Sequence, residues 1–124
     1  MPEILVGAWE SAQPGSNTTL AYRFTGDGRY AYAGVLTYPR SEQKDDFYLL
    51  KTTAVGKVDI DGQKLTLRPS SASTTRKDPR FPGDDYTDRP EPLTPKHFTW
   101  AVADEVLTLT GEDDLQFVLL RAAS

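Results

Sequence analysis

Residues 20–32 read LAYRFTGDGRYAY, and this stretch decides the fold. Apolar and aromatic side chains occupy every second position on both sides of the turn Gly26-Asp27-Gly28. A period of two places one set of side chains on one face of a β-strand. An Asp-Gly pair between two such runs is a strong hairpin signal. The stretch therefore predicts two antiparallel strands that share one buried face.

The same alternation recurs along most of the 124 residues. It predicts eight strands, near residues 4–11, 18–25, 29–38, 47–60, 64–69, 96–103, 105–110 and 114–121. No segment shows the period of an amphipathic helix, and residues 40–46 are polar enough for a loop. We expect one all-β domain over residues 1–124. A sandwich fits the pattern, but the sequential hairpin spacing favours an up-and-down antiparallel barrel, which leaves no exposed edges.

Residues 69–95 depart from the pattern, because they hold six of the nine prolines and many charged side chains. Proline lacks the N–H donor that a central strand needs, so the sequence predicts a long loop here. Long loops in small domains are either lids over a site or solvated connections, and the sequence leaves both open. If the loop is a lid, Tyr86 and Arg89 are the residues expected to cover a ligand.

The composition excludes several classes of function. The absence of cysteine excludes disulfides, thiolate catalysis and Cys-ligated metals, and the lone His97 excludes a multi-His metal site. We expect His97 to point outward, and we expect no metal and no cofactor. The net charge of −4 argues against a nucleic-acid partner. The first five residues do not resemble a signal peptide, and no stretch is apolar enough for a membrane span, so we expect a cytoplasmic protein.

The two ends of the chain carry a further pattern. Gly7-Ala8-Trp9 lies on the first predicted strand, and Arg121 lies at the end of the last. Together with the hairpins at residues 22–30 and 58–67, this combination resembles the lipocalin/calycin superfamily, in particular its small bacterial lipocalin-like domains. The resemblance implies that Trp9 plugs the closed end of the barrel and that Arg121 packs across the indole, a contact that cation–π attraction favours.

Alternation from Trp9 and Phe24 assigns the inner face of the barrel. Its expected members are Leu20, Tyr22, Phe24, Tyr30, Tyr32, Leu36, Tyr38, Tyr48, Leu50, Val58, Ile60, Leu65, Leu67, Phe98, Trp100, Val102, Phe117 and Leu119. Tyrosines are unusual in such a core, because each buried phenol needs a hydrogen-bond partner.

An apolar cup with a few hydroxyl groups is typical of a small-molecule site. We expect Tyr32, Tyr38 and Tyr48 to bind a ligand, with Trp100 and Phe117 as walls. Tyr22 and Tyr30 lie near the hairpin turn, and we interpret these two residues as structural.

Three functions fit these features. The first is binding of a small, largely apolar or aromatic molecule in the barrel. The second is a cyclase or isomerase of natural-product biosynthesis that uses the same cavity, for which the sequence names no catalytic residue. The third is a barrel filled by its own side chains that contacts a partner through residues 69–95. The sequence identifies neither the ligand nor the oligomeric state.

Overall fold

A computed structural model describes residues 2–11, 18–39 and 47–122, with the backbone alone at Tyr38, Pro39 and Phe47. The predicted loop 40–46 lies outside the described residues. The strands are β1 (Gly7–Ser11), β2 (Thr18–Phe24), β3 (Arg29–Pro39), β4 (Phe47–Asp61), β5 (Lys64–Lys77), β6 (Tyr86–Pro90), β7 (Lys96–Ala103), β8 (Val106–Gly111) and β9 (Gln116–Arg121). Two short 3₁₀ helices, η1 (Glu3–Leu5) and η2 (Pro82–Asp84), complete the described elements.

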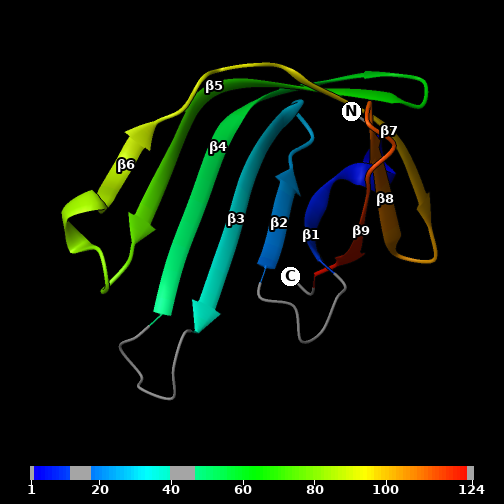
Figure 1. The fold of residues 1–124 in the computed structure, drawn as a ribbon. Helices are drawn as coiled ribbons and strands as arrows, with labels where there is room; N and C mark the ends of the chain where they lie inside the picture. Colours follow the sequence, from blue (N-terminus) through cyan, green and yellow to red (C-terminus); the bar gives the residue numbers. More distant parts are fainter. Residues whose placement is uncertain (1, 12–17, 40–46, 123–124) are drawn as a thin grey trace.

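The strands form a closed antiparallel barrel of eight strands. Each strand pairs with its neighbour in the chain from β1 to β5, and the ring continues through β7, β8 and β9 back to β1. The ninth strand, β6, lies beside the second half of β5 and is not part of the ring (Figure 1). The predicted fold class, an all-β up-and-down barrel, is confirmed.

The hairpin at residues 20–32 forms as expected. Tyr22 stands opposite Tyr32, and Phe24 stands opposite Tyr30. Gly28 has a positive φ of 80°, a conformation that glycine adopts without strain, and its N–H donates to the carbonyl of Thr25 at 3.1 Å. The first strand is shorter than expected, because residues 3–5 form η1 instead of β-structure.

The prediction of a loop over residues 69–95 needs correction. The strand β5 does not end at Pro69 but continues to Lys77, paired with β4. Pro69 is tolerated because the register shifts beside Gly56, where no residue of β4 stands opposite Ser70, and β-bulges of this kind accommodate proline. A Cβ on Gly56 would collide with the Arg68 carbonyl, so the close approach of the two backbones requires glycine. The threonines and serines after Pro69 then form an ordinary strand.

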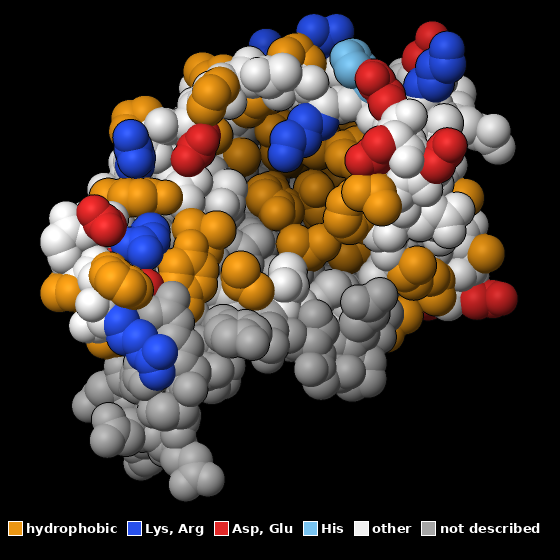
Figure 2. Space-filling view, in the orientation of Figure 1, with side chains coloured by type: hydrophobic (Ala, Val, Ile, Leu, Met, Phe, Trp, Pro, Cys, Tyr) orange, Lys and Arg blue, Asp and Glu red, His pale blue; other side chains and the backbone are white. Residues whose placement is uncertain are grey.

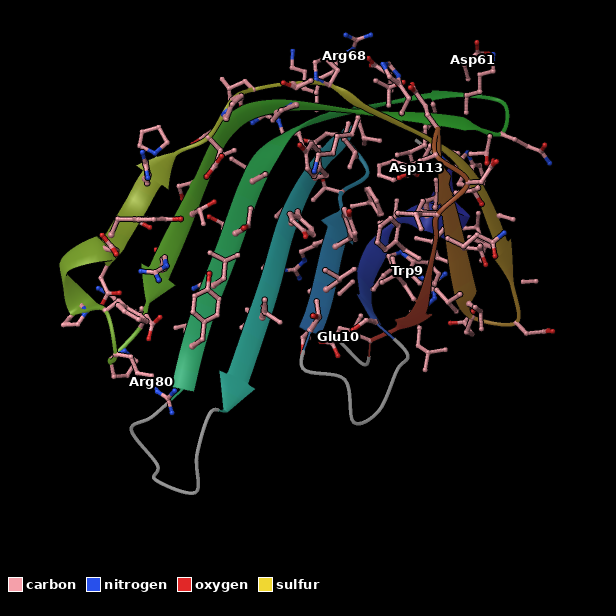
Figure 3. The ribbon with its side chains drawn as sticks, in the orientation of Figure 1. Trp9, Glu10, Asp61, Arg68, Arg80 and Asp113 are labelled. Atoms are coloured by element: carbon pink, nitrogen blue, oxygen red, sulfur yellow. The ribbon has the colours of Figure 1, made fainter. Side chains whose placement is uncertain are left out.

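One part of the barrel interior is filled by large side chains, which we call the packed region. Its members are at most 1% exposed: Leu5, Trp9, Phe24, Leu65, Leu107, Leu109 and Leu119. Trp9 lies inside the ring of strands, whereas Arg80 lies beyond the far end of β5 (Figure 3). Burial of this apolar surface supplies the main stabilisation of the fold.

The contact between the two chain ends closes the packed region. The guanidinium carbon of Arg121 lies 4.2 Å from the centre of the Trp9 ring. Its nitrogens donate to the carbonyls of Val6 and Ile4, at 3.0 and 2.7 Å, and the indole N–H of Trp9 donates to Leu5 at 2.9 Å. Gly7 has a φ of 128°, and a Cβ there would lie 3.2 Å from Arg121 Nη1. Glycine two residues before Trp9 thus makes room for the arginine.

Candidate functional site

The other part of the interior is a cavity of about 490 Å³. Strands β2 to β6 and residues 91–96 surround it. In Figure 2 a hollow opens toward the viewer, with mainly apolar side chains on its inner surface and charged side chains along its rim. The volume lies within the range of small-molecule sites.

The cavity exists because small side chains stand in the same cross-strand row as large ones. Tyr22 of β2 stands opposite Tyr32 of β3, which stands opposite Ala54 of β4, which stands opposite Ala72 of β5. All four side chains line the cavity. The two tyrosines fill one half of the row, and the two alanines leave the other half open.

Threonines extend the open half of the cavity. Thr52 and Thr74 stand opposite each other, and their hydroxyl oxygens lie 3.4 Å apart. Leu50 and Leu67 add apolar surface to the same wall. The wall formed by β4 and β5 therefore combines small side chains with two leucines and presents both apolar and hydroxyl groups to the cavity.

Three tyrosines form one face of the cavity, and we call Tyr22, Tyr30 and Tyr32 the tyrosine cluster. The rings of Tyr22 and Tyr32 lie 4.8 Å apart between centres, tilted by 37°. Tyr32 leans along β3 over Gly34, where a Cβ would collide with its hydroxyl oxygen. Among the described residues, none of the three hydroxyls has a hydrogen-bond partner.

The environment keeps these phenols protonated. Burial raises the pKa of Tyr22 well above the ordinary value of about 10, and the neighbouring Tyr32 and Tyr30 raise it further. Burial also raises the pKa of Tyr30 and of Tyr32. All three hydroxyls therefore remain neutral donors at physiological pH.

The rim of the cavity carries Glu91 and Lys96. Neither forms an ion pair within the described part of the chain. The backbone N–H of Glu91 donates to the Ala72 carbonyl at 3.0 Å, which holds the 91–95 segment against β5. The rim thus offers one negative and one positive group, fixed to the barrel by backbone contacts.

An ion-pair cluster holds β6 and η2 beside the cavity. Arg76 Nη2 lies 3.2 Å from the buried Asp78 carboxylate, and Nη1 lies 3.5 Å from Asp85. The N–H of Asp78 donates to the Asp85 carboxylate at 2.7 Å. This cluster fixes the connection between β5 and β6, and with it the position of Tyr86 at the cavity wall.

The structure places only some of the predicted site residues at the cavity. Tyr32 and the expected lid residue Tyr86 line it, and Arg89 lies on the ring of Tyr86, 5.1 Å from its centre. Tyr48 packs under the Arg76 guanidinium at 5.4 Å and is not part of the lining. The side chain of Tyr38 lies outside the described residues.

The two predicted walls lie elsewhere in the barrel. The indole N–H of Trp100 donates to the Gly62 carbonyl at 3.0 Å, and Phe117 contacts Phe98 edge to face at 6.3 Å. Both pack against the packed region instead of lining the cavity. Tyr22 and Tyr30, interpreted from the sequence as structural, belong to the buried core and also line the cavity.

Sequence reasoning overlooked the small residues that create the space. Ala54, Ala72, Thr52 and Thr74 all occupy inward positions on β4 and β5. The sequence carries a signal for these residues, because small side chains stand two positions apart on both strands. They are Thr52 and Ala54 on β4, and Ala72 and Thr74 on β5. Because residues 69–95 are predicted as a loop, the sequence does not assign Ala72 and Thr74 to inward positions of a strand.

The remaining polar candidate, His97, lies on the outer surface as expected. It is exposed, and its Nδ1 lies 3.1 Å from the Thr66 hydroxyl. In the described ranges, no group of three or more acidic or histidine side chains is placed to hold a metal ion. Within the same ranges, no helix has the length and apolar character that crossing a membrane requires.

A comparison of the chain with models of known protein families and with curated proteins finds no similar sequence.

Proposed function

We propose that the protein is a lipocalin-like barrel that binds a small, largely apolar or aromatic molecule in its cavity. The observation that carries the proposal is the cavity of about 490 Å³ between the tyrosine cluster and the short side chains of β4 and β5. A barrel of eight strands holds one small ligand when its interior is not filled. The contact between Trp9 and Arg121 supports the lipocalin-like assignment.

The chemistry of the lining supports an aromatic or apolar ligand. Four tyrosine rings, Leu50 and Leu67 provide surface for a planar hydrocarbon skeleton, and hydroxyl groups fix its orientation. The net charge of −4 does not suit nucleic acid as the ligand.

The cavity itself provides the test. We would titrate the protein with N-phenyl-1-naphthylamine, a neutral aromatic probe whose fluorescence rises on transfer to an apolar site. Ala72→Leu extends a side chain into the cavity, and we expect it to weaken binding at least about tenfold. The control is Ser71→Leu, because Ser71 is the adjacent residue on the exposed face of β5. Equal affinity in the two variants would contradict the proposed site.

A cyclase or isomerase in the same cavity is a second candidate. The tyrosine cluster favours it, because neutral hydroxyl donors can stabilise an oxyanion that develops in a transition state. Mass spectrometry of the protein incubated with a small-molecule extract of its source cells separates the two functions. A bound mass already present in the extract supports binding alone, whereas a new mass indicates turnover.

The third possibility, a filled barrel that contacts a partner through residues 69–95, has less support. Much of that segment belongs to β5 and β6, and its inward residues Ala72 and Thr74 line the cavity.

A further inference from the structure

The tyrosine cluster contains three hydrogen-bond donors that the described chain leaves without acceptors. Tyr22 and Tyr30 are only 7% and 5% exposed, so bulk water has little access to their side chains. Among the described residues, Arg76 Nη1 is the single buried side-chain nitrogen or oxygen that lacks a hydrogen bond. The three phenol oxygens therefore border accessible space, and all three tyrosines line the cavity.

The three hydroxyls act on one region of the cavity. The rings of Tyr22 and Tyr32 are in contact, and Tyr30 lies two residues before Tyr32 on β3 and lines the same cavity. A ligand atom in this region meets several donors at once. Because a desolvated hydroxyl without a partner is unfavourable, an acceptor on the ligand gains free energy that a hydrocarbon at the same place does not.

The charge near the cluster favours a neutral acceptor. Burial raises the pKa of all three phenols, which means that a negative charge is disfavoured at this place. The cation Arg76, which stands opposite Tyr86 beside the cavity, already contacts the carboxylates of Asp78 and Asp85. At the rim, Lys96 is accompanied by the opposite charge of Glu91.

We propose that the cavity selects neutral aromatic ligands that carry a ketone or similar oxygen, with this oxygen accepting hydrogen bonds from the tyrosine cluster. The inference rests on the proposed function and specifies its ligand class. The planar skeleton lies against the wall of Ala54 and Ala72, and the oxygen points toward Tyr22 and Tyr32.

Three probes with one skeleton test this selection. 2-Acetylnaphthalene carries a neutral acceptor, 2-isopropylnaphthalene has a similar shape without one, and 2-naphthoate carries a negative charge. We would measure the three dissociation constants by isothermal titration calorimetry at pH 7. We expect the acetyl probe to bind about tenfold more tightly than the isopropyl probe, as one or two net hydrogen bonds predict, and the naphthoate to bind most weakly.

Phenylalanine variants assign the difference to the cluster. In the double variant Tyr22→Phe/Tyr32→Phe the rings remain and the two hydroxyls toward which the ligand oxygen points are removed, so we expect most of the difference between the acetyl and isopropyl probes to disappear. The control is Tyr48→Phe, whose ring packs on Arg76 away from the cavity, and the tenfold difference should persist there. The single variant Tyr32→Phe serves if the double variant unfolds, with part of the difference lost.

The outcomes separate this inference from the proposed function. Equal binding of the acetyl and isopropyl probes to the unmodified protein overturns the inference but leaves a hydrophobic binding cavity. If 2-naphthoate binds most tightly of the three probes, the inference is also overturned. The negative charge of the ligand would then be recognised at the rim, by Lys96. If none of the three probes binds, both the inference and the proposed function fail.

Discussion

The packed region and the cavity are two halves of one barrel interior that differ in the size of their inward side chains. In the packed region, inward positions of β8 and β9 carry Leu107, Leu109 and Leu119, each fully buried. In the cavity, inward positions of β4 and β5 carry residues such as Ala54 and Ala72. An eight-stranded barrel can be filled or can hold a ligand, and this one does both in different places.

The two halves are also closed in different ways. Hydrogen bonds and a cation–π contact from Arg121 fasten η1 over the packed region. The cavity is bordered by β6, which pairs with β5 and is held by the ion-pair cluster, and by the 91–95 segment, where the N–H of Glu91 donates to the Ala72 carbonyl. Because the packed region buries large apolar side chains completely, we expect it to contribute more to stability than the walls of the cavity.

The sharpest test of this comparison is one substitution made in both halves. Leu107→Ala removes a fully buried side chain, and we expect it to lower the free energy of unfolding by about 3–5 kcal/mol. Leu50→Ala removes a side chain that already borders open space, and we expect a loss of about 1 kcal/mol. Urea unfolding measures both. Similar losses would contradict the division of the interior.

The next largest effect concerns the ion-pair cluster beside the cavity. Arg76→Met removes the guanidinium from the fully buried Asp78, and we expect a loss of about 2–3 kcal/mol. Limited proteolysis should show faster cleavage within residues 77–86. The control is Arg68→Met, because Arg68 pairs with Asp59 at an exposed site, where such pairs contribute about 0–1 kcal/mol. Unchanged protease resistance in Arg76→Met would show that other contacts hold β6.

A smaller effect is expected at the closure of the packed region. Arg121→Lys keeps the positive charge but loses the planar group that contacts Trp9 and two carbonyls. We expect a loss of about 1–2 kcal/mol in the free energy of unfolding. Arg29→Lys, at an exposed hairpin position, should leave stability nearly unchanged. If Arg121→Lys left the free energy of unfolding unchanged, the contribution of Arg121 would depend on its positive charge alone and not on its planar group.

The smallest effect is a dependence of stability on alkaline pH. The folded protein holds the Tyr22 proton more tightly than the unfolded chain, because burial raises the pKa of this phenol. Its contribution to stability is complete below about pH 10 and decreases as the pH rises above that value, where only the unfolded chain ionises. Urea unfolding at pH 8 and pH 11 should show a smaller decrease for Tyr22→Phe. Identical decreases would mean that Tyr22 ionises freely in the barrel.

Much of the barrel was predictable from the alternation of side chains. Trp9, Phe24 and Leu119 were expected to face inward, and all three are buried. The hairpin at residues 20–32 forms with the expected turn. These features are local, since they depend on period two and on turn residues that act over a few positions.

Less of the cavity was predictable. Tyr32 and Tyr86 were singled out and line it, but Trp100 and Phe117 were also singled out and pack elsewhere. The same alternation assigns Trp100 and Tyr22 to the inner face without saying which interior space each one meets. The ability of these residues to bind a ligand stays a prediction.

The sequence by itself predicted the all-β barrel and part of its packed region, including Trp9, Phe24, Leu65 and Leu119, because side-chain period and turn chemistry are properties of short segments. The tertiary structure alone decided where the barrel is hollow. That depends on which residues stand opposite each other, as Tyr32, Ala54 and Ala72 do. The register of β4 and β5 passes through the bulge at Gly56, which accommodates Pro69 in a strand that local composition disfavours.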